Sequence, residues 1–329
     1  MLNPYLHLNP KLFEKDVSLI PTRDGFGEAL VHLGEVNRDI VVLTADLSES
    51  TRCEEFAKKF PERFFEVGVA EQNMAAIAAG LAVSGKIPFI SSYATFSPGK
   101  NWETIRTTIV YNEANVKIAG HHSGIVTGPD GATHQATEDI ATVRAWPNIS
   151  VVVPCDSIEA KKATILSAKT KEPVYLRFTR DKTPVITTEH TPYEENKIQT
   201  FWVTNNPQAT IFATGHLLYF ALLAAKNLEE KGINVLVANV SSVKPLDEKT
   251  LLELSKTGAF VSVEDHQIMG GLGGALAEFV VKNKPLPIEF IGLQDTFAES
   301  GPALDLIRKY QMDEIAIEKA VKKVIGRKK

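Results

Sequence analysis

The segment Ile40-Val-Val-Leu-Thr44 is a continuous apolar run, and a run of this length is typical of a strand buried on both faces. The segment before it predicts a helix, since apolar side chains recur there at helical spacing: Phe26, Ala29, Leu30, Leu33 and Val36. More strand-like runs follow, with helical segments between them: Phe64–Val67, Ile87–Ser91, Val116–Gly120, Ser150–Val153 and Val174–Phe178. This alternation indicates an α/β fold with a largely parallel sheet flanked by helices.

Several polar or flexible residues come directly after these strands. Asp46, Gly68, Ser92 and His121 each follow a different strand. Because ligands of parallel sheets bind at the carboxyl ends of the strands, we expect the candidate site to lie at this one edge.

A second α/β unit follows an irregular interval. Residues 181–208 are rich in proline, and we interpret 184–207 as a linker. The alternation then restarts, with strands expected at 209–214, 233–240, 259–264 and 286–292, helices at 216–231, 247–257 and 272–283, and a helical tail at 303–327. The chain is therefore expected to form two domains with mostly parallel sheets flanked by helices, 1–183 with an N-terminal extension at 1–20, and 208–329.

Composition excludes several classes of function. Of the 329 residues, 44% are hydrophobic and 23% charged, which is typical of a soluble globular protein. The net charge of −4 gives no footprint for nucleic acid or an acidic membrane. Cys53 and Cys155 match no metal or redox spacing, so we expect reduced structural thiols. No apolar run approaches the roughly 18 residues of a membrane span, and no signal peptide is evident, so we expect a cytoplasmic location.

The segment Gly68-Val-Ala-Glu71-Gln-Asn-Met74 places a carboxylate in the first turn of a helix. An acidic residue at that position needs no special role, because it complements the helix dipole. The alanines and glycine that follow make a thin helix, however, which allows close packing against another backbone or a cofactor. Glu71 is therefore a candidate catalytic residue.

Two histidines lie among glycines in the next candidate segment. His134 belongs to Asp130-Gly-Ala-Thr-His134-Gln135, and His122 lies twelve residues upstream. Glycines at 120, 124, 128 and 131 let the backbone approach a ligand closely. A lone Asp130-Gly131 pair would predict only a turn, but the attached Thr133-His134-Gln135 favours a functional site.

Together these segments resemble the pyrimidine-binding domain of the transketolase family, in order from about Arg23 to Arg180. The second unit resembles the family's C-terminal domain, and we interpret its glycine-rich Gly270–Gly274 as a packing turn. The resemblance implies that Glu71 activates thiamine diphosphate, that Phe96 stacks on its aminopyrimidine, and that Asp46 lies near the cofactor at a subunit contact. After Phe96 the family element continues with further aromatics, whereas here Ser97-Pro-Gly-Lys100 intervenes.

The same resemblance implies a sugar phosphate site. His134 would contact the reacting end of the substrate and shuttle protons, and the remaining contacts would come from Arg23, Ser50, His122, Asp130 and Arg180. Guanidinium groups suit phosphate because they donate in a planar fork. His121 has no clear counterpart in the family, and we expect it to be structural.

The Gly-Asp-Gly…Asn signature, by which the family binds the diphosphate through a metal, does not occur in the sequence. The resemblance therefore implies the C-terminal subunit of a split transketolase of the pentose phosphate pathway, which transfers a two-carbon ketol unit from a ketose phosphate to an aldose phosphate. A partner chain would carry that signature, bind a Mg or Ca ion and share the thiamine diphosphate in a heterotetramer.

Three alternatives stay open at this point. The synthase of 1-deoxyxylulose 5-phosphate shares both motifs, but it carries an acidic-basic pair where this chain has His121-His122-Ser123. The β subunit of 2-oxo acid dehydrogenases has a similar size, but it lacks the Asp-Gly-x-Thr-His run. A catalytically silent interaction subunit would have no physical need for the glutamate, the histidines and the arginines together.

Overall fold

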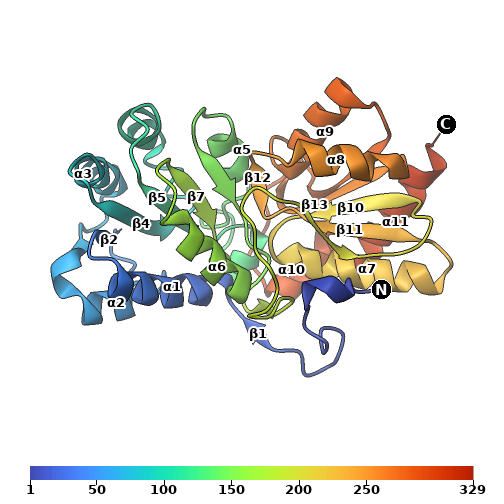
Figure 1. Cartoon of the computed structure of the whole chain (residues 1–329), viewed down its shortest axis with the longest axis horizontal. Coiled ribbons are helices and arrows are strands. Elements are labelled where there is room, and N and C mark those ends of the chain that lie inside the picture. The colour runs from blue at the N-terminus through green and yellow to red at the C-terminus, as the bar shows by residue number, and fades with distance from the viewer. Residues whose placement is uncertain (329) are drawn as a thin grey trace.

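A computed structural model describes residues 1–328 and shows two α/β units lying side by side (Figure 1). The first unit contains a seven-stranded sheet in the order β12-β6-β7-β5-β4-β2-β3. Its strands are β2 (Ile40–Thr44), β3 (Phe64–Glu66), β4 (Ile87–Tyr93), β5 (Lys117–His121), β6 (Ser150–Val152), β7 (Val174–Arg177) and β12 (Ser242–Lys244). All of them pair in parallel except β12. The strands expected from the sequence are thus confirmed, with ends that shift by one or two residues.

Helices cover both faces of this sheet, as the continuous apolar strands require. On one face, Phe26 and Leu30 of α1 (Thr22–Val36) pack with Ala160 of α6 (Ser157–Ser167) and with Phe56 of α2 (Glu54–Lys59). On the other face, Met74 of α3 (Glu71–Val83) joins a core with residues of α5 (Asp139–Arg144) and of the π-helix Ile105–Val110. Short helical segments occur at Pro4–Leu6, Pro61–Arg63, Trp102–Thr104 and Ile125–Asp130.

The second unit contains a five-stranded sheet in the order β14-β13-β10-β11-β9. Its strands are β9 (Gln199–Trp202), β10 (Ala209–Ala213), β11 (Val235–Asn239), β13 (Phe260–Gln267) and β14 (Ile288–Leu293), and only β9 is antiparallel to its neighbour. The helices are α7 (Leu218–Glu230), α8 (Glu248–Leu254), α9 (Leu272–Asn283), α10 (Ala303–Lys309) and α11 (Glu314–Gly326), with short turns at Gly215–Leu217 and Ser255–Thr257. The predicted fold class is confirmed in both units.

The structure adds detail where the chain crosses between the units. The irregular interval 181–208 contains β8 (Thr183–Pro184), which pairs with β1 (Leu19–Ile20), and it also contains β9. The N-terminal segment packs on the second unit, where Leu12 is fully buried in the core (Figure 1). Conversely, β12, which comes from the second half of the sequence, is an edge strand of the first sheet. The two units therefore share elements, and the boundaries at 183 and 208 stay predictions.

The helical tail expected at 303–327 consists of two helices, α10 and α11. The chain turns at Gln311, which has a positive φ of 56°. Asp313 then caps α11, because its side chain accepts a hydrogen bond from the backbone N–H of Ala316.

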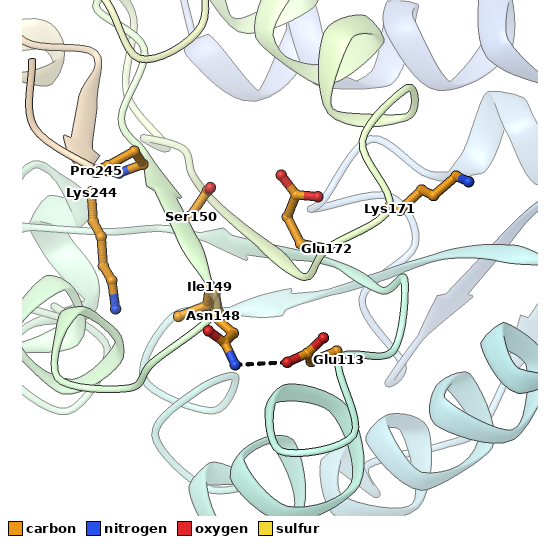
Figure 2. Close-up of a pocket in the computed structure, with 8 residues that line it drawn as sticks. All are labelled: Glu113, Asn148, Ile149, Ser150, Lys171, Glu172, Lys244 and Pro245. Carbon is orange, nitrogen blue, oxygen red and sulfur yellow. Dashed lines mark hydrogen bonds between the residues drawn. The ribbon is translucent and has the colours of Figure 1, made fainter.

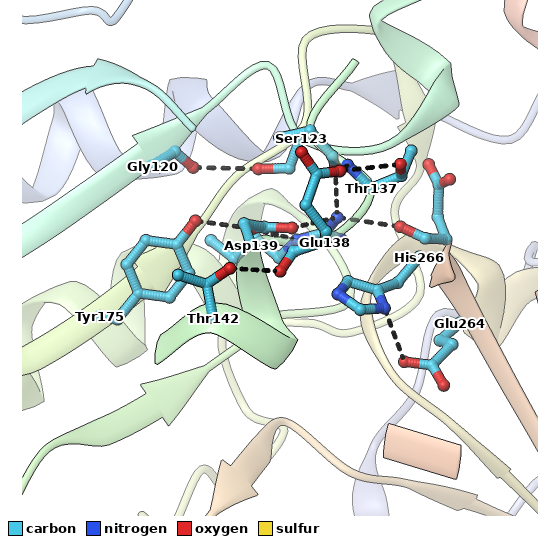
Figure 3. A network of polar contacts seen from close by, with 12 residues as sticks. Gly120, Ser123, Thr137, Glu138, Asp139, Thr142, Tyr175, Glu264 and His266 are labelled. Carbon is cyan, nitrogen blue, oxygen red and sulfur yellow. Dashed lines mark hydrogen bonds and ion pairs between the residues drawn. The ribbon is translucent and has the colours of Figure 1, made fainter. Parts of the chain in front are cut away.

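A buried ionic network joins the two units (Figure 3). Arg177 of β7 binds Asp139 of α5 through two hydrogen bonds, with Nε–Oδ2 at 2.8 Å and Nη2–Oδ1 at 3.1 Å. Arg177 Nη2 also donates to the carbonyl oxygens of Ala136 and of Asp265 in the second unit. The Asp265 carboxylate in turn accepts from the backbone N–H of Ile125 at 2.9 Å. The network therefore holds residues 120–139, the segment that contains both candidate histidines.

Two further expectations about the chain can be compared with the structure. Both cysteines are buried and unpaired, in agreement with structural thiols. Within residues 1–328, no helix is both long and apolar enough to cross a membrane.

Candidate active site

The carboxyl edge of the first sheet gathers the candidate residues. Asp46 follows β2, Glu71 follows β3 after a glycine turn, Phe96 follows β4, and His122 follows β5. Arg180 lies three residues beyond the end of β7. The expected convergence on one edge thus follows from the parallel pairing of these strands.

Glu71 is the first residue of α3 and is almost fully buried, with 1% of its surface exposed. Gly68, with a φ of +69°, turns the chain from β3 toward the helix. Lys100 Nζ donates to Glu71 Oε2 over 2.7 Å, and Asn101 Nδ2 donates to the Glu71 backbone carbonyl over 3.1 Å. Within residues 1–328, Oε1 accepts no hydrogen bond, so this buried carboxylate keeps one oxygen for a further donor.

An aromatic cluster lies over the same edge. Tyr93, at the end of β4, stacks on His122 with ring centroids 3.8 Å apart and on Phe96 at 5.9 Å. His134 meets the Phe96 ring edge-on at 5.5 Å, and its Nδ1 lies 2.9 Å from Thr133 Oγ1. The structure therefore brings Phe96 and both candidate histidines together around Tyr93.

His122 is held as a neutral ring. Burial, followed by the charge of Arg23, lowers the pKa of His122 to about 3. Its Nε2 lies 3.5 Å from Arg23 Nη1, whereas its Nδ1 is buried without a partner among the described residues. An unpaired buried nitrogen costs free energy unless a ligand satisfies it.

Three arginines line a cavity of about 450 Å³ beside these rings: Arg23, Arg52 and Arg180. Arg23 Nη1 donates to the backbone carbonyl of Ser50 over 2.7 Å. Arg180 Nη1 donates to the Thr127 carbonyl over 2.9 Å and lies 3.6 Å from Asp130 Oδ1. Burial, and then the charge of Arg52, lowers the pKa of Arg23, as expected where positive charges gather. The lining also contains Lys182 and two aspartates, Asp24, which binds Arg52 over 2.7 Å, and Asp181. Four basic side chains thus face two acidic ones, and this positive balance suits an anion.

Asp46 lies at the outer end of this edge. It is exposed, has a positive φ of 61°, and its backbone N–H donates to Glu66 Oε1 over 2.6 Å. The same oxygen accepts from the backbone N–H of Gly68 over 3.0 Å. Glu66 therefore links the end of β2 to the turn that precedes Glu71, while Asp46 leaves its own carboxylate free of hydrogen bonds within residues 1–328.

His121, expected to be structural, is fully buried on the face of the sheet that α1 covers. Its Nε2 lies 3.0 Å from Ser91 Oγ, and its ring packs against Phe26 and Phe178. The glycine-rich turn before α9 is also structural, because Glu264 accepts from the backbone N–H groups of Leu272 and Gly273. That helix terminus is thus satisfied internally.

Sequence reasoning missed four residues at this edge: Tyr93, Lys100, Arg52 and Glu66. Tyr93 lies three residues before Phe96 in the sequence, and only its stacking on His122 distinguishes it from a core residue. Lys100 lies in the segment that departs from the family pattern, which was the one available signal.

A second cavity, of about 500 Å³, opens at the opposite edge of the sheet (Figure 2). Its lining includes Glu113 before β5, Ser150 at the start of β6 and Glu172 before β7. Asn148 Nδ2 donates to Glu113 Oε1 there over 2.8 Å. None of the candidate site residues lines this cavity, which separates it from the site described above.

Two family models match the chain: "Transketolase, pyrimidine binding domain" over residues 18–185, and "Transketolase, C-terminal domain" over residues 202–317. A putative transketolase C-terminal section from Methanocaldococcus jannaschii is 44% identical over 306 residues, which are 91% of this chain and 94% of that protein. The 6-deoxy-6-sulfo-D-fructose transketolase subunit SqwH from Clostridium sp. is 35% identical over 93% of this chain and 95% of its own length.

A solved structure described as a split-gene transketolase, inactive β4 tetramer, has a TM-score of 0.88 and 41% identity, with 94% of this chain and 100% of that chain covered. The chain therefore belongs to the transketolase family of transferases. Over its length it corresponds to the C-terminal subunit of split transketolases. A pyrimidine-binding domain of this family implies thiamine diphosphate as the cofactor. These matches favour transketolase over the two related enzyme classes.

Proposed function

We propose that this chain and an N-terminal partner form a transketolase that moves a two-carbon ketol unit from a ketose phosphate to an aldose phosphate. The observation that carries the proposal is the pairing of two features at one sheet edge. A buried glutamate with a free oxygen lies at the same sheet edge as the half-buried Phe96 ring, and an arginine-lined cavity lies beyond the histidines.

The residues present fit the aminopyrimidine end of thiamine diphosphate. Glu71 Oε1 has no hydrogen-bond partner within residues 1–328, so it can accept a hydrogen bond from a ring nitrogen. The half-buried Phe96 ring offers a face for stacking, worth on the order of 1 kcal/mol beyond burial. When bound, thiamine diphosphate supplies the nucleophilic carbon that attacks the ketose carbonyl. Glu71 holds and returns the proton that this activation requires.

The substrate roles follow from charge and position. Arg23 and Arg180 bind the phosphate, with Ser50 beside Arg23 as a further donor. His134 donates to the reacting end of the sugar and shuttles protons. His122, neutral and with a free Nδ1, contacts a sugar oxygen, and Asp130 accepts from a hydroxyl group.

The partner subunit supplies what this sequence lacks. It carries the Gly-Asp-Gly…Asn signature, binds a Mg or Ca ion and anchors the diphosphate, and Asp46 lies at the contact between subunits. The two chains assemble into a cytoplasmic heterotetramer of the pentose phosphate pathway. The relative described as an inactive β4 tetramer supports an oligomer and an inactive state without the partner.

The test is reconstitution. The purified chain alone should neither bind thiamine diphosphate tightly in calorimetry nor catalyse ketol transfer, and both properties should appear on mixing with the N-terminal subunit. Robust turnover by the single chain would overturn the split-enzyme proposal. A mixed complex that binds the cofactor but transfers no ketol unit would favour a silent interaction subunit.

A further inference from the structure

Lys100, which binds the carboxylate of Glu71, belongs to the segment Ser97–Lys100, where this chain departs from the family pattern. The Nζ–Oε2 distance is 2.7 Å, and the glutamate is 1% exposed whereas the lysine side chain is 44% exposed. The neighbouring Asn101, itself fully buried, donates to the Glu71 backbone carbonyl. Two consecutive residues thus fix one glutamate.

The same turn contains the aromatic ring proposed to stack on the cofactor. The backbone N–H groups of Lys100 and Asn101 donate to the Phe96 carbonyl over 2.9 and 3.3 Å. Backbone hydrogen bonds therefore join Phe96, Lys100 and Asn101 in one turn, so a group that stacks on Phe96 meets a glutamate oriented by the same turn.

The burial of Glu71 makes this ion pair different from a surface pair. A carboxylate removed from water needs a counter-charge or several hydrogen-bond donors, whereas an exposed pair contributes little. The chain offers a matched comparison in Lys86, whose Nζ lies 2.9 Å from Asp39 Oδ1 and whose side chain is 41% exposed. There the carboxylate partner is 56% exposed, so the two lysines differ mainly in the burial of the partner.

We propose that Lys100 is a positioning residue for Glu71: by donating to Oε2, it holds the carboxylate so that Oε1 faces the cofactor's ring nitrogen. The inference rests on the proposed function for the identity of that ring. The ion pair itself does not depend on the partner subunit, and it can be tested on the chain alone.

On the chain alone, the test is a double-mutant cycle followed by thermal unfolding. Lys100→Met should lower the midpoint by about 2 °C or more, whereas Lys86→Met should change it by less than about 1 °C. In a Glu71→Gln background, Lys100→Met should have almost no further effect. Equal small shifts in the two lysine variants would overturn the ion-pair half of the inference.

In the complex with the N-terminal subunit, the readout is the dissociation constant of thiamine diphosphate, measured by calorimetry. Lys100→Met should raise this dissociation constant about tenfold and lower kcat, because the charge-assisted contact from Lys100 orients the Glu71 carboxylate that accepts the ring nitrogen's hydrogen bond. Lys100→Arg should recover most of the affinity, and Lys86→Met should match the unmutated complex. Unchanged or tighter binding by Lys100→Met would overturn a positioning role. Failure of the unmutated complex to bind the cofactor would instead overturn the proposed function.

Discussion

Replacing Asp139 with Asn should destabilise the chain strongly, because it removes the counter-charge of a buried arginine. The side chains of Arg177 and Asp139 are 3% and 2% exposed, and they are joined by two hydrogen bonds. Burial alone would raise the pKa of Asp139, but Arg177 outweighs burial and lowers it. The carboxylate therefore stays ionised in the folded chain, and Asn would leave Arg177 with an uncompensated charge.

The expected loss follows from the geometry. Removing one member of a buried ion pair costs about 3–5 kcal/mol. Because Arg177 keeps its bonds to the carbonyls of Ala136 and Asp265, we expect the low end, about 3 kcal/mol, which for a chain of 329 residues is about 4 °C in the unfolding midpoint. The double variant Arg177→Met/Asp139→Leu should cost less than the sum of the single changes, since no unpaired charge remains.

The assay is urea unfolding followed by circular dichroism, with Glu278→Gln as the control. Glu278 also binds an arginine, Arg144, through two hydrogen bonds, but its side chain is 67% exposed. Glu278→Gln should therefore lower the free energy of unfolding by less than about 1 kcal/mol. Hydrogen exchange should also speed up over residues 120–139 in Asp139→Asn. If Asp139→Asn and Glu278→Gln lower the free energy of unfolding by equally small amounts, burial does not strengthen the Arg177–Asp139 pair. That result would refute the reasoning.

Glu71→Gln should abolish most ketol transfer by the assembled enzyme while leaving assembly by size-exclusion chromatography intact, because an amide cannot cycle a proton; near-normal turnover would contradict the thiamine assignment. Arg180→Ala should raise KM roughly ten- to hundredfold for phosphorylated donors but barely for hydroxypyruvate, whereas His134→Ala should lower kcat/KM for both donors. Equal impairment by Arg180→Ala on both donors would place that residue outside the phosphate site. The pKa of His122, about 3 when folded against roughly 6.5 when unfolded, means that the unfolded chain binds the extra proton between these values. The stability that neutral His122 contributes is thus complete above about pH 6.5 and is lost as pH falls toward 3. In the variant His122→Asn, the unfolding midpoint should therefore fall less steeply between pH 7 and 4. A slope equal to that of the unmutated chain would refute this linkage.

The layered fold could be predicted without the structure, because the sequence patterns that specify it are local. The continuous apolar run at Ile40–Thr44 and the helical spacing that begins at Phe26 depend only on near neighbours along the chain. The placement of Glu71 in the first turn of a helix and of His122 just after a strand followed in the same way. Parallel pairing then brings the carboxyl ends of the strands that precede these residues to one edge of the sheet.

The side-chain contacts of the site, by contrast, could not be predicted from the sequence. Lys100 and Glu71 are 29 positions apart, and no periodicity along the chain indicates that they share a buried ion pair. Tyr93 stacks on His122 across neighbouring strands, and β12 crosses from the second half of the chain to complete the first sheet. Such contacts depend on the register and twist of packed elements, whereas the hydrophobic pattern specifies only which face each element buries.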